Sequence, residues 1–192
     1  MGIPMFFIRL TGCNLRCKWC DTQYAFYEGE YKSEDELVNM ANKMGYEWVC
    51  LTGGEPLLQD GVYSLLYGLM KKHKVLIETN GSILIDEVPT EDNVFISLDI
   101  KTPSSGMHKA MKFENIDYLG DGDYVKFVIA DEEDYRYALK VIEDYDIHVD
   151  IIFQPVWGYD LRALAERAIK DGLNVRVLPQ LHKIIWGEKR GV

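Results

Sequence analysis

Short apolar runs alternate with longer amphipathic stretches along most of the chain. The short runs predict strands near residues 5–10, 48–52, 74–78, 94–99, 123–129, 148–153 and 174–178. Apolar residues at helical spacing predict helices near residues 34–44, 59–72, 132–145 and 159–171. Strands that alternate with helices predict a mostly parallel α/β sheet, either open or curled into part of a barrel.

Two of the predicted helices have clear end signals. Ser33 with Glu36 three residues later forms a capping box at the start of the first helix. The last helix places its apolar residues on one face and ends before Gly172. These signals support the predicted boundaries.

Polar residues of unusual type follow six of the seven predicted strands. These segments are Cys13–Thr22, Thr52–Pro56, Glu78–Gly81, Asp99–Pro103, Gln154–Pro155 and Leu178–Gln180. In parallel α/β folds the active site lies at the carboxyl ends of the strands. We therefore expect one functional site at this edge of the sheet.

Three of the four cysteines form a C-x3-C-x2-C cluster directly after the first apolar run. Thiolates as close as those of Cys13, Cys17 and Cys20 point to one small, soft metal centre. A [4Fe–4S] cluster is usually held by four cysteines, so one iron would stay open for a substrate or cofactor. Cys50 stands in an apolar run, where we expect a buried, inert residue. Structural zinc, with His182 or Asp21 as fourth ligand, is the alternative.

Two other segments suggest ligand binding. The glycines of Thr52–Pro56 let a ligand approach the backbone, and the carboxylate of Glu55 suits an ammonium group. Asp99 and Lys101 are two residues apart at a strand end, so both point into the same face of the barrel mouth. A surface ion pair is the alternative for this pair, and a simple Asn-Gly turn is the alternative for Glu78–Gly81.

Composition narrows the class of protein. The 192 residues suffice for one domain with a proper core. The 31 acidic and 21 basic residues give a formal charge of −10, which argues against nucleic-acid binding. No apolar stretch reaches the ~18–20 residues of a membrane span, and the start shows no signal-peptide pattern. Clustered cysteines suit a reducing compartment, so a cytoplasmic protein is expected.

The motifs resemble those of a known family. The three cysteines, Trp19 and the Gly53–Pro56 turn resemble the radical S-adenosylmethionine (SAM) superfamily. Within it, the segment Phe7–Thr22 resembles the 7-carboxy-7-deazaguanine synthase family. Further matches extend along nearly the whole chain: Glu78–Gly81, Asp99–Met107, Lys126–Ile129 and Leu178–Lys183.

The resemblance implies a modified partial (β/α) barrel, a homodimer and three cofactors: a [4Fe–4S] cluster, SAM and Mg2+. The thiolates would hold the cluster, and SAM would chelate the open iron and be cleaved to methionine and a 5′-deoxyadenosyl radical. The radical would abstract hydrogen from 6-carboxy-5,6,7,8-tetrahydropterin. Ring contraction with loss of ammonia would then give 7-carboxy-7-deazaguanine. An electron donor such as flavodoxin or ferredoxin is implied.

The resemblance also assigns residues by position. The SAM-binding positions are Trp19, Cys20, Asp21, Gly54, Glu55, Asp99, Ile100 and Lys101. Arg9 and Thr52 match substrate-binding positions, and the planar fork of Arg9 suits a carboxylate. Thr22 matches the magnesium ligand, and a hydroxyl oxygen is a suitable hard donor.

One family feature is not found, and two alternatives stay open. The family carries a Gln-Gly-Glu segment upstream of the Gly2–Pro4 equivalent, so residues 1–192 are expected to form a single radical SAM domain that lacks this segment. Pterin binding is then expected to be weak, unless His182, Lys183 or the terminal carboxylate of Val192 completes the pocket. The alternative functions are a glycyl-radical-enzyme activase and a non-catalytic iron–sulfur redox or metal-binding module.

Overall fold

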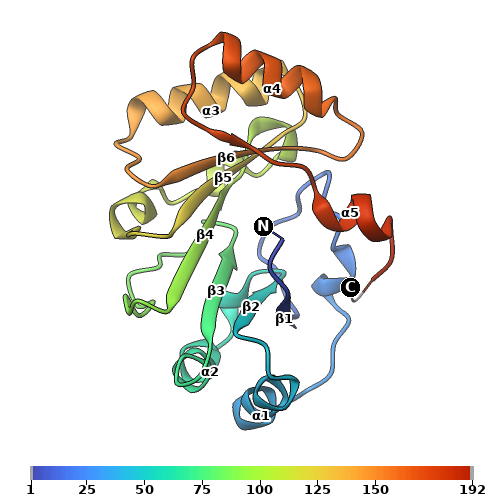
Figure 1. Ribbon diagram of the computed structural model, residues 1–192, viewed down its shortest axis with the longest axis vertical. Coiled ribbons are helices and arrows are strands. Elements are labelled where there is room, and N and C mark those ends of the chain that lie inside the picture. The colour runs from blue at the N-terminus through green and yellow to red at the C-terminus, as the bar shows by residue number, and fades with distance from the viewer. Residues whose placement is uncertain (1, 191–192) are drawn as a thin grey trace.

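The computed structural model describes residues 2–190, which form one curled sheet with helices along its outer side (Figure 1). The sheet has seven strands, paired in chain order, and every neighbouring pair is parallel. The strands are β1 (Met5–Leu10), β2 (Trp48–Gly53), β3 (Lys74–Thr79), β4 (Val94–Ile100), β5 (Tyr124–Ile129), β6 (Asp150–Pro155) and β7 (Arg176–Val177). The predicted α/β class and partial-barrel architecture are confirmed.

Five α-helices accompany the sheet within residues 2–190. They are α1 (Glu34–Met44), α2 (Val62–Leu69), α3 (Glu132–Asp144), α4 (Leu161–Lys170) and α5 (Leu181–Trp186). Short 3-10 helices cover Gln23–Phe26, Pro56–Leu58, Pro103–Ser105, His108–Ala110 and Phe113–Tyr118. Figure 1 shows α5 on the open side of the curl, apart from the other four helices. Within residues 2–190, no helix combines the length and the apolar character needed to cross a bilayer.

The two faces of the sheet differ in chemistry. Side chains alternate along each strand, and the set that includes Leu51, Ile77, Leu98, Phe127 and Phe153 is fully buried in the hydrophobic core. Helices α1 to α4 place their apolar stripes against this outer face, as shown by the buried residues Ala41, Leu66, Ala138 and Leu164. The inner face is left to the opposite set of side chains, many of which are polar.

Most predicted elements agree with the structure within a few residues. The capping box is present, because the Ser33 side chain accepts a hydrogen bond from the backbone of Glu36 and the Glu36 carboxylate accepts one from the backbone of Ser33. The predicted helix 59–72 is shorter, since Gly61 precedes its first turn. The predicted strand 174–178 keeps only two residues in the ladder, and α5 was not predicted because six residues give almost no periodic signal.

A polar contact links α3 to the end of α4. The Tyr135 hydroxyl donates to the Asp171 carboxylate at 2.9 Å, and the Arg167 guanidinium donates to the same oxygen at 2.7 Å. The hydrogen bond from Arg167 has the larger effect and that from Tyr135 the smaller, and together they hold the pKa of Asp171 below its usual value. Burial, together with Asp171, raises the pKa of Tyr135 to about 12. The contact therefore favours the ionised carboxylate.

We predict that Asp171→Asn destabilises the fold at neutral pH and that the difference from wild type shrinks on acidification. A carboxyl group whose pKa is lower in the folded state stabilises above the unfolded pKa, about 4, and loses this contribution as pH falls through the folded pKa. Urea unfolding midpoints of both proteins between pH 7 and pH 3 test this. Asp121→Asn, at an exposed loop position, is the matched control. A difference that stays constant with pH would contradict the prediction.

Candidate active site

The cysteine loop follows β1 and is fixed by its own backbone and side chains. Gly12 donates its N–H to Ala25 at 2.8 Å, and Lys18 donates to Ser105 at 3.0 Å. The Arg16 guanidinium donates to the Cys13 carbonyl at 2.7 Å and stacks over the Phe26 ring at 4.4 Å. The loop is thus tied to the segment that follows it and to the segment after β4.

The glycine pair after β2 is in contact with the cysteine loop. Gly54 donates its N–H to Leu10 at 3.1 Å, and Glu55 donates to Gly12 at 2.8 Å. A Cβ on Gly53 would overlap the Leu10 carbonyl, and one on Gly54 would overlap the Gly12 carbonyl. The sequence suggested a close approach by a ligand, whereas the structure shows that the approaching backbone belongs to the chain itself.

The carboxylate of Glu55 is fully buried. It accepts hydrogen bonds from the backbone N–H of Leu57 at 3.1 Å, the Thr79 hydroxyl at 2.9 Å and the Asn80 N–H at 2.6 Å. Burial raises the pKa of Glu55 even though these donors oppose the shift. The side chain therefore joins the turn after β2 to the turn after β3, and its oxygens face the protein.

This link places Asn80 beside the cysteines. The Asn80 amide donates to the Cys13 sulfur at 3.8 Å and to the Asn14 side chain at 3.1 Å. For the Glu78–Gly81 segment, the sequence also allows a simple Asn-Gly turn. Its left-handed Gly81, φ 73°, fits that interpretation, but the turn also aims a donor at a thiol.

One cavity collects residues from the carboxyl ends of the first four strands. Its lining comprises Cys13, Leu15, Cys17, Cys20, Thr22, Phe26, Gly53, Gly54, Asn80 and Lys101. All four cysteines are free, and burial raises the pKa of Cys17 to about 11, with Lys101 opposing the shift. Burial also raises the pKa of Cys20. Neutral thiols at this depth would release their protons on binding iron.

These residues fit an iron–sulfur cluster better than zinc. Among residues 2–190, no three His, Cys, Asp or Glu side chains converge closely enough for a single metal ion. The proposed fourth zinc ligands, His182 and Asp21, lie outside the lining of the cavity and are 47% and 40% exposed, with 3.5 Å between their nearest side-chain atoms. In an iron–sulfur cluster the thiolates bind different irons, so three cysteines need not converge on one ion.

Asp99 and Lys101 form a sheltered ion pair and not a surface one. The Lys101 ammonium lies 3.0 Å from Asp99 Oδ2, and the Lys126 ammonium lies 3.1 Å from the same oxygen. The exposed fraction of the side chain is only 11% for Lys101, 15% for Asp99 and 17% for Lys126. Lys101 also lies over the Trp19 ring at 5.6 Å, which connects the pair to the cysteine loop.

The inner face of the sheet continues this polar surface. Arg9 pairs in register with Thr52, the Thr52 hydroxyl donates to Glu78 at 3.1 Å, and Asp99 pairs in register with Lys126. Glu78 belongs to the segment Glu78–Gly81, which the sequence places at the functional edge, whereas the sequence gives Lys126 no role in the site. The signal was available, because charged residues inside strands of a parallel sheet are unusual when helices cover both faces.

Within residues 2–190, three other predicted site residues make no side-chain hydrogen bond to the cysteines. The Ile100 side chain packs in the outer core, so only its backbone faces the site. The Thr22 hydroxyl donates to the Asp21 carboxylate at 2.8 Å. Arg9 is exposed at the open end of the sheet. Val192 lies outside the described residues.

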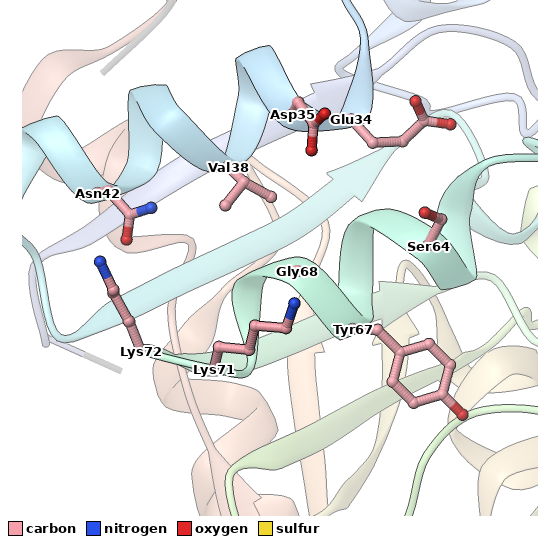
Figure 2. Close-up of a pocket in the computed structure, with 9 residues that line it drawn as sticks. All are labelled: Glu34, Asp35, Val38, Asn42, Ser64, Tyr67, Gly68, Lys71 and Lys72. Carbon is pink, nitrogen blue, oxygen red and sulfur yellow. The ribbon is translucent and has the colours of Figure 1, made fainter.

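A larger cavity of about 320 Å3 lies elsewhere, between α1 and α2. Figure 2 shows Lys72 and Asn42 at one end and Glu34 and Asp35 at the other, with the Tyr67 ring turned outward. It contains no thiol and lies away from the carboxyl ends of the strands. Its size alone therefore does not make it the catalytic site.

Comparison with known proteins places the chain in a family. A family model described as the radical SAM superfamily matches residues 7–154. The 7-carboxy-7-deazaguanine synthase of Thermoplasma acidophilum is 43% identical over 192 residues, covering 100% of this chain and 92% of the relative. The enzyme of that name from Methanospirillum hungatei is 40% identical, covering 96% of this chain and 78% of the relative.

Solved structures agree on the fold. QueE from Escherichia coli superimposes with a TM-score of 0.72 at 22% identity, covering 94% of this chain and 86% of that chain. Streptococcus suis SuiB, bound to its precursor peptide SuiA, gives 0.71 at 14% identity and covers 94% of this chain and 49% of that chain. The chain belongs to the radical SAM superfamily and, within it, to the 7-carboxy-7-deazaguanine synthase family.

Proposed function

We propose that this protein is a radical SAM lyase that converts 6-carboxy-5,6,7,8-tetrahydropterin to 7-carboxy-7-deazaguanine with loss of ammonia. This step belongs to the synthesis of queuosine or archaeosine precursors. The observation that carries the proposal is the cysteine-lined cavity in a chain 43% identical over its full length to a synthase of that name. Anaerobic incubation with reductant, SAM and the pterin, followed by mass analysis, tests it. Absence of the deazapurine product would overturn it.

The cluster would be held by Cys13, Cys17 and Cys20, which open into one cavity. When bound, the cluster supplies the electron that cleaves SAM. The protein's own residues keep the sulfurs in a defined setting: the Asn80 amide and the Leu15 N–H both donate to Cys13. Hydrogen bonds to cluster sulfurs tune the reduction potential.

The SAM site would extend from Trp19, Cys20 and Asp21 across Gly54 to the Asp99–Lys101 segment. Ile100 would contribute backbone, since its side chain is in the core. Glu55 would contribute chiefly by holding the turns, because all its hydrogen bonds in the described structure are internal. Lys101 and Asp99 offer side-chain charge close to Cys17.

The pterin would lie on the polar inner face, near Arg9 and Thr52. Arg9 is exposed at the open side of the sheet, where its guanidinium can bind the substrate carboxylate. Thr22 would offer its hydroxyl to Mg2+ at the cavity edge. A substrate contact from Val192 and the single domain of residues 1–192 stay predictions.

The remaining assignments concern partners. We propose a homodimer, supported by the exposed apolar side chains of Ile184, Ile185 and Trp186 on α5. A flavodoxin or ferredoxin would deliver the electron, in the cytoplasm, where free thiols persist. The activase and the non-catalytic module gain no support from the relatives, whose names specify a synthase.

We predict that Cys13→Ala, Cys17→Ala and Cys20→Ala each abolish the visible absorbance of the cluster. Each change removes one of only three thiolates available to the metal. Cys50→Ala should keep it, because Cys50 is fully buried in β2 and its pKa is raised by burial. Iron content and absorbance of the reconstituted proteins provide the measurement. Full iron content in Cys17→Ala would refute the ligand assignment.

Gly54→Ala should lose most of its bound iron while the sheet remains folded. The added methyl would overlap the Gly12 carbonyl and crowd Cys13, so the cysteine loop must move away from β2. Gly120→Ala is the matched control, because Gly120, like Gly54, is outside the left-handed region and no described atom lies within 4 Å of its added carbon. Normal iron content in Gly54→Ala would show that the loop does not depend on this contact.

Thr22→Val should lower the stimulation of turnover by Mg2+ but leave SAM cleavage intact. The change keeps the volume and removes only the hydroxyl that would bind the ion. Thr11→Val is the control, because the Thr11 hydroxyl donates to the Glu28 carbonyl at 2.6 Å. Turnover measured against Mg2+ concentration decides the matter. Wild-type magnesium dependence in Thr22→Val would assign the ion to another ligand.

A further inference from the structure

Lys126 is a largely sheltered cation that no part of the proposed chemistry uses. It lies in the middle of β5 on the inner face of the sheet, with a side chain only 17% exposed. A charge in such a place is costly unless it is paired. Burial disfavours the ammonium form, but Asp99 and Glu78 more than offset this and raise the pKa of Lys126 above its usual range. The side chain therefore stays charged.

The two carboxylate oxygens of Asp99, the partner of Lys126, have different surroundings. Both Lys126 and Lys101 approach Oδ2 of Asp99, at 3.1 Å and 3.0 Å. The other oxygen, Oδ1, is buried and accepts no hydrogen bond from any residue between 2 and 190. A buried acceptor without a donor is unfavourable, so its presence points to a donor that arrives with a ligand.

The two lysines hold Asp99 from different sides. Lys101 follows the end of β4 and lies over Trp19, on the side of the cysteine loop. Lys126 stands directly opposite Asp99 in the strand register, on the side of the inner face. With Lys126 removed, the carboxylate is free to turn and give both oxygens to Lys101, which would occupy Oδ1.

We propose that Lys126 is a positioning residue: it fixes Oδ2 of Asp99 so that Oδ1 is presented to a hydroxyl or ammonium donor of bound SAM. The inference rests on the proposed function, in which Asp99 lines the SAM site. Lys126 does not touch the reacting atoms and acts only through Asp99. It extends the SAM site from the ends of the strands to the middle of the inner face.

Affinity for SAM in the reconstituted protein, measured by calorimetry without pterin, tests the proposal. Lys126→Met and Asp99→Asn should each weaken SAM binding about tenfold or more, since ~1.4 kcal/mol corresponds to tenfold. The double variant should bind no more weakly than the weaker single variant, because both changes remove the same interaction. Fold-changes that multiply in the double variant, or unchanged affinity in Lys126→Met, would overturn the proposal.

Lys126→Arg is a second variant that tests the proposal even if Lys126→Met fails to fold. It keeps the charge, but the arginine fork can bind both carboxylate oxygens and so occupy Oδ1. Weakened SAM binding with wild-type iron content and unfolding midpoint is expected. Wild-type affinity in Lys126→Arg would mean that only the charge matters and would reject positioning.

Lys140→Met is the matched control, because Lys140 forms an exposed ion pair with Asp144 on α3 and should not affect SAM binding. The outcomes also separate this proposal from the proposed function. If wild-type protein with a full cluster fails to bind SAM, the proposed function fails. If wild type binds SAM and Lys126→Met binds it equally well, only the role of Lys126 is refuted.

Discussion

The contact between the cysteine loop and the turn after β2 determines the geometry of the whole site. Two backbone hydrogen bonds, from Gly54 to Leu10 and from Glu55 to Gly12, bring the loop against the sheet. Only glycine fits at the contact, because a Cβ would overlap the facing carbonyls. The buried Glu55 then transmits this placement to the turn after β3, where Asn80 meets Cys13. Three consecutive strand ends are thereby joined through backbone and one carboxylate.

The second constraint is the difference between the faces of the sheet. A parallel sheet with helices on both sides would bury apolar residues on both faces. Here α1 to α4 cover one face only, and the curl leaves the inner face open to polar groups. The ion pairs of Asp99 are possible because the curl shelters them from solvent. Because side chains alternate along each strand, one set forms the hydrophobic core on the outer face and the other set forms the polar site on the inner face.

The sequence was sufficient for the positions of the strands along the chain and for their functional ends. Apolar runs and the C-x3-C-x2-C spacing are local patterns, so β1 to β6 and the cysteine loop could be predicted. The roles of side chains that meet only because the sheet curls could not be predicted from these patterns. Glu55 was expected to meet a ligand, but its burial depends on the neighbouring turn after β3. A charge inside β5 marks Lys126 as unusual, but its partner Asp99 follows only from the register between β4 and β5, which no local pattern reveals.

Residues that share a motif can have different roles in the folded site. A motif identifies which side chains recur near a cofactor, and the hydrogen bonds show whether each acts by touching the ligand or by holding another group. Gly54 and Glu55 share one motif, yet one is required for close packing of backbone and the other for linking two turns. Among residues 2–190, Asp99 is one of four residues with a buried side-chain atom that has no hydrogen-bond partner, and its other oxygen lies close to both lysines. The site is therefore best understood as a rigid frame of internal contacts that leaves a few polar atoms free.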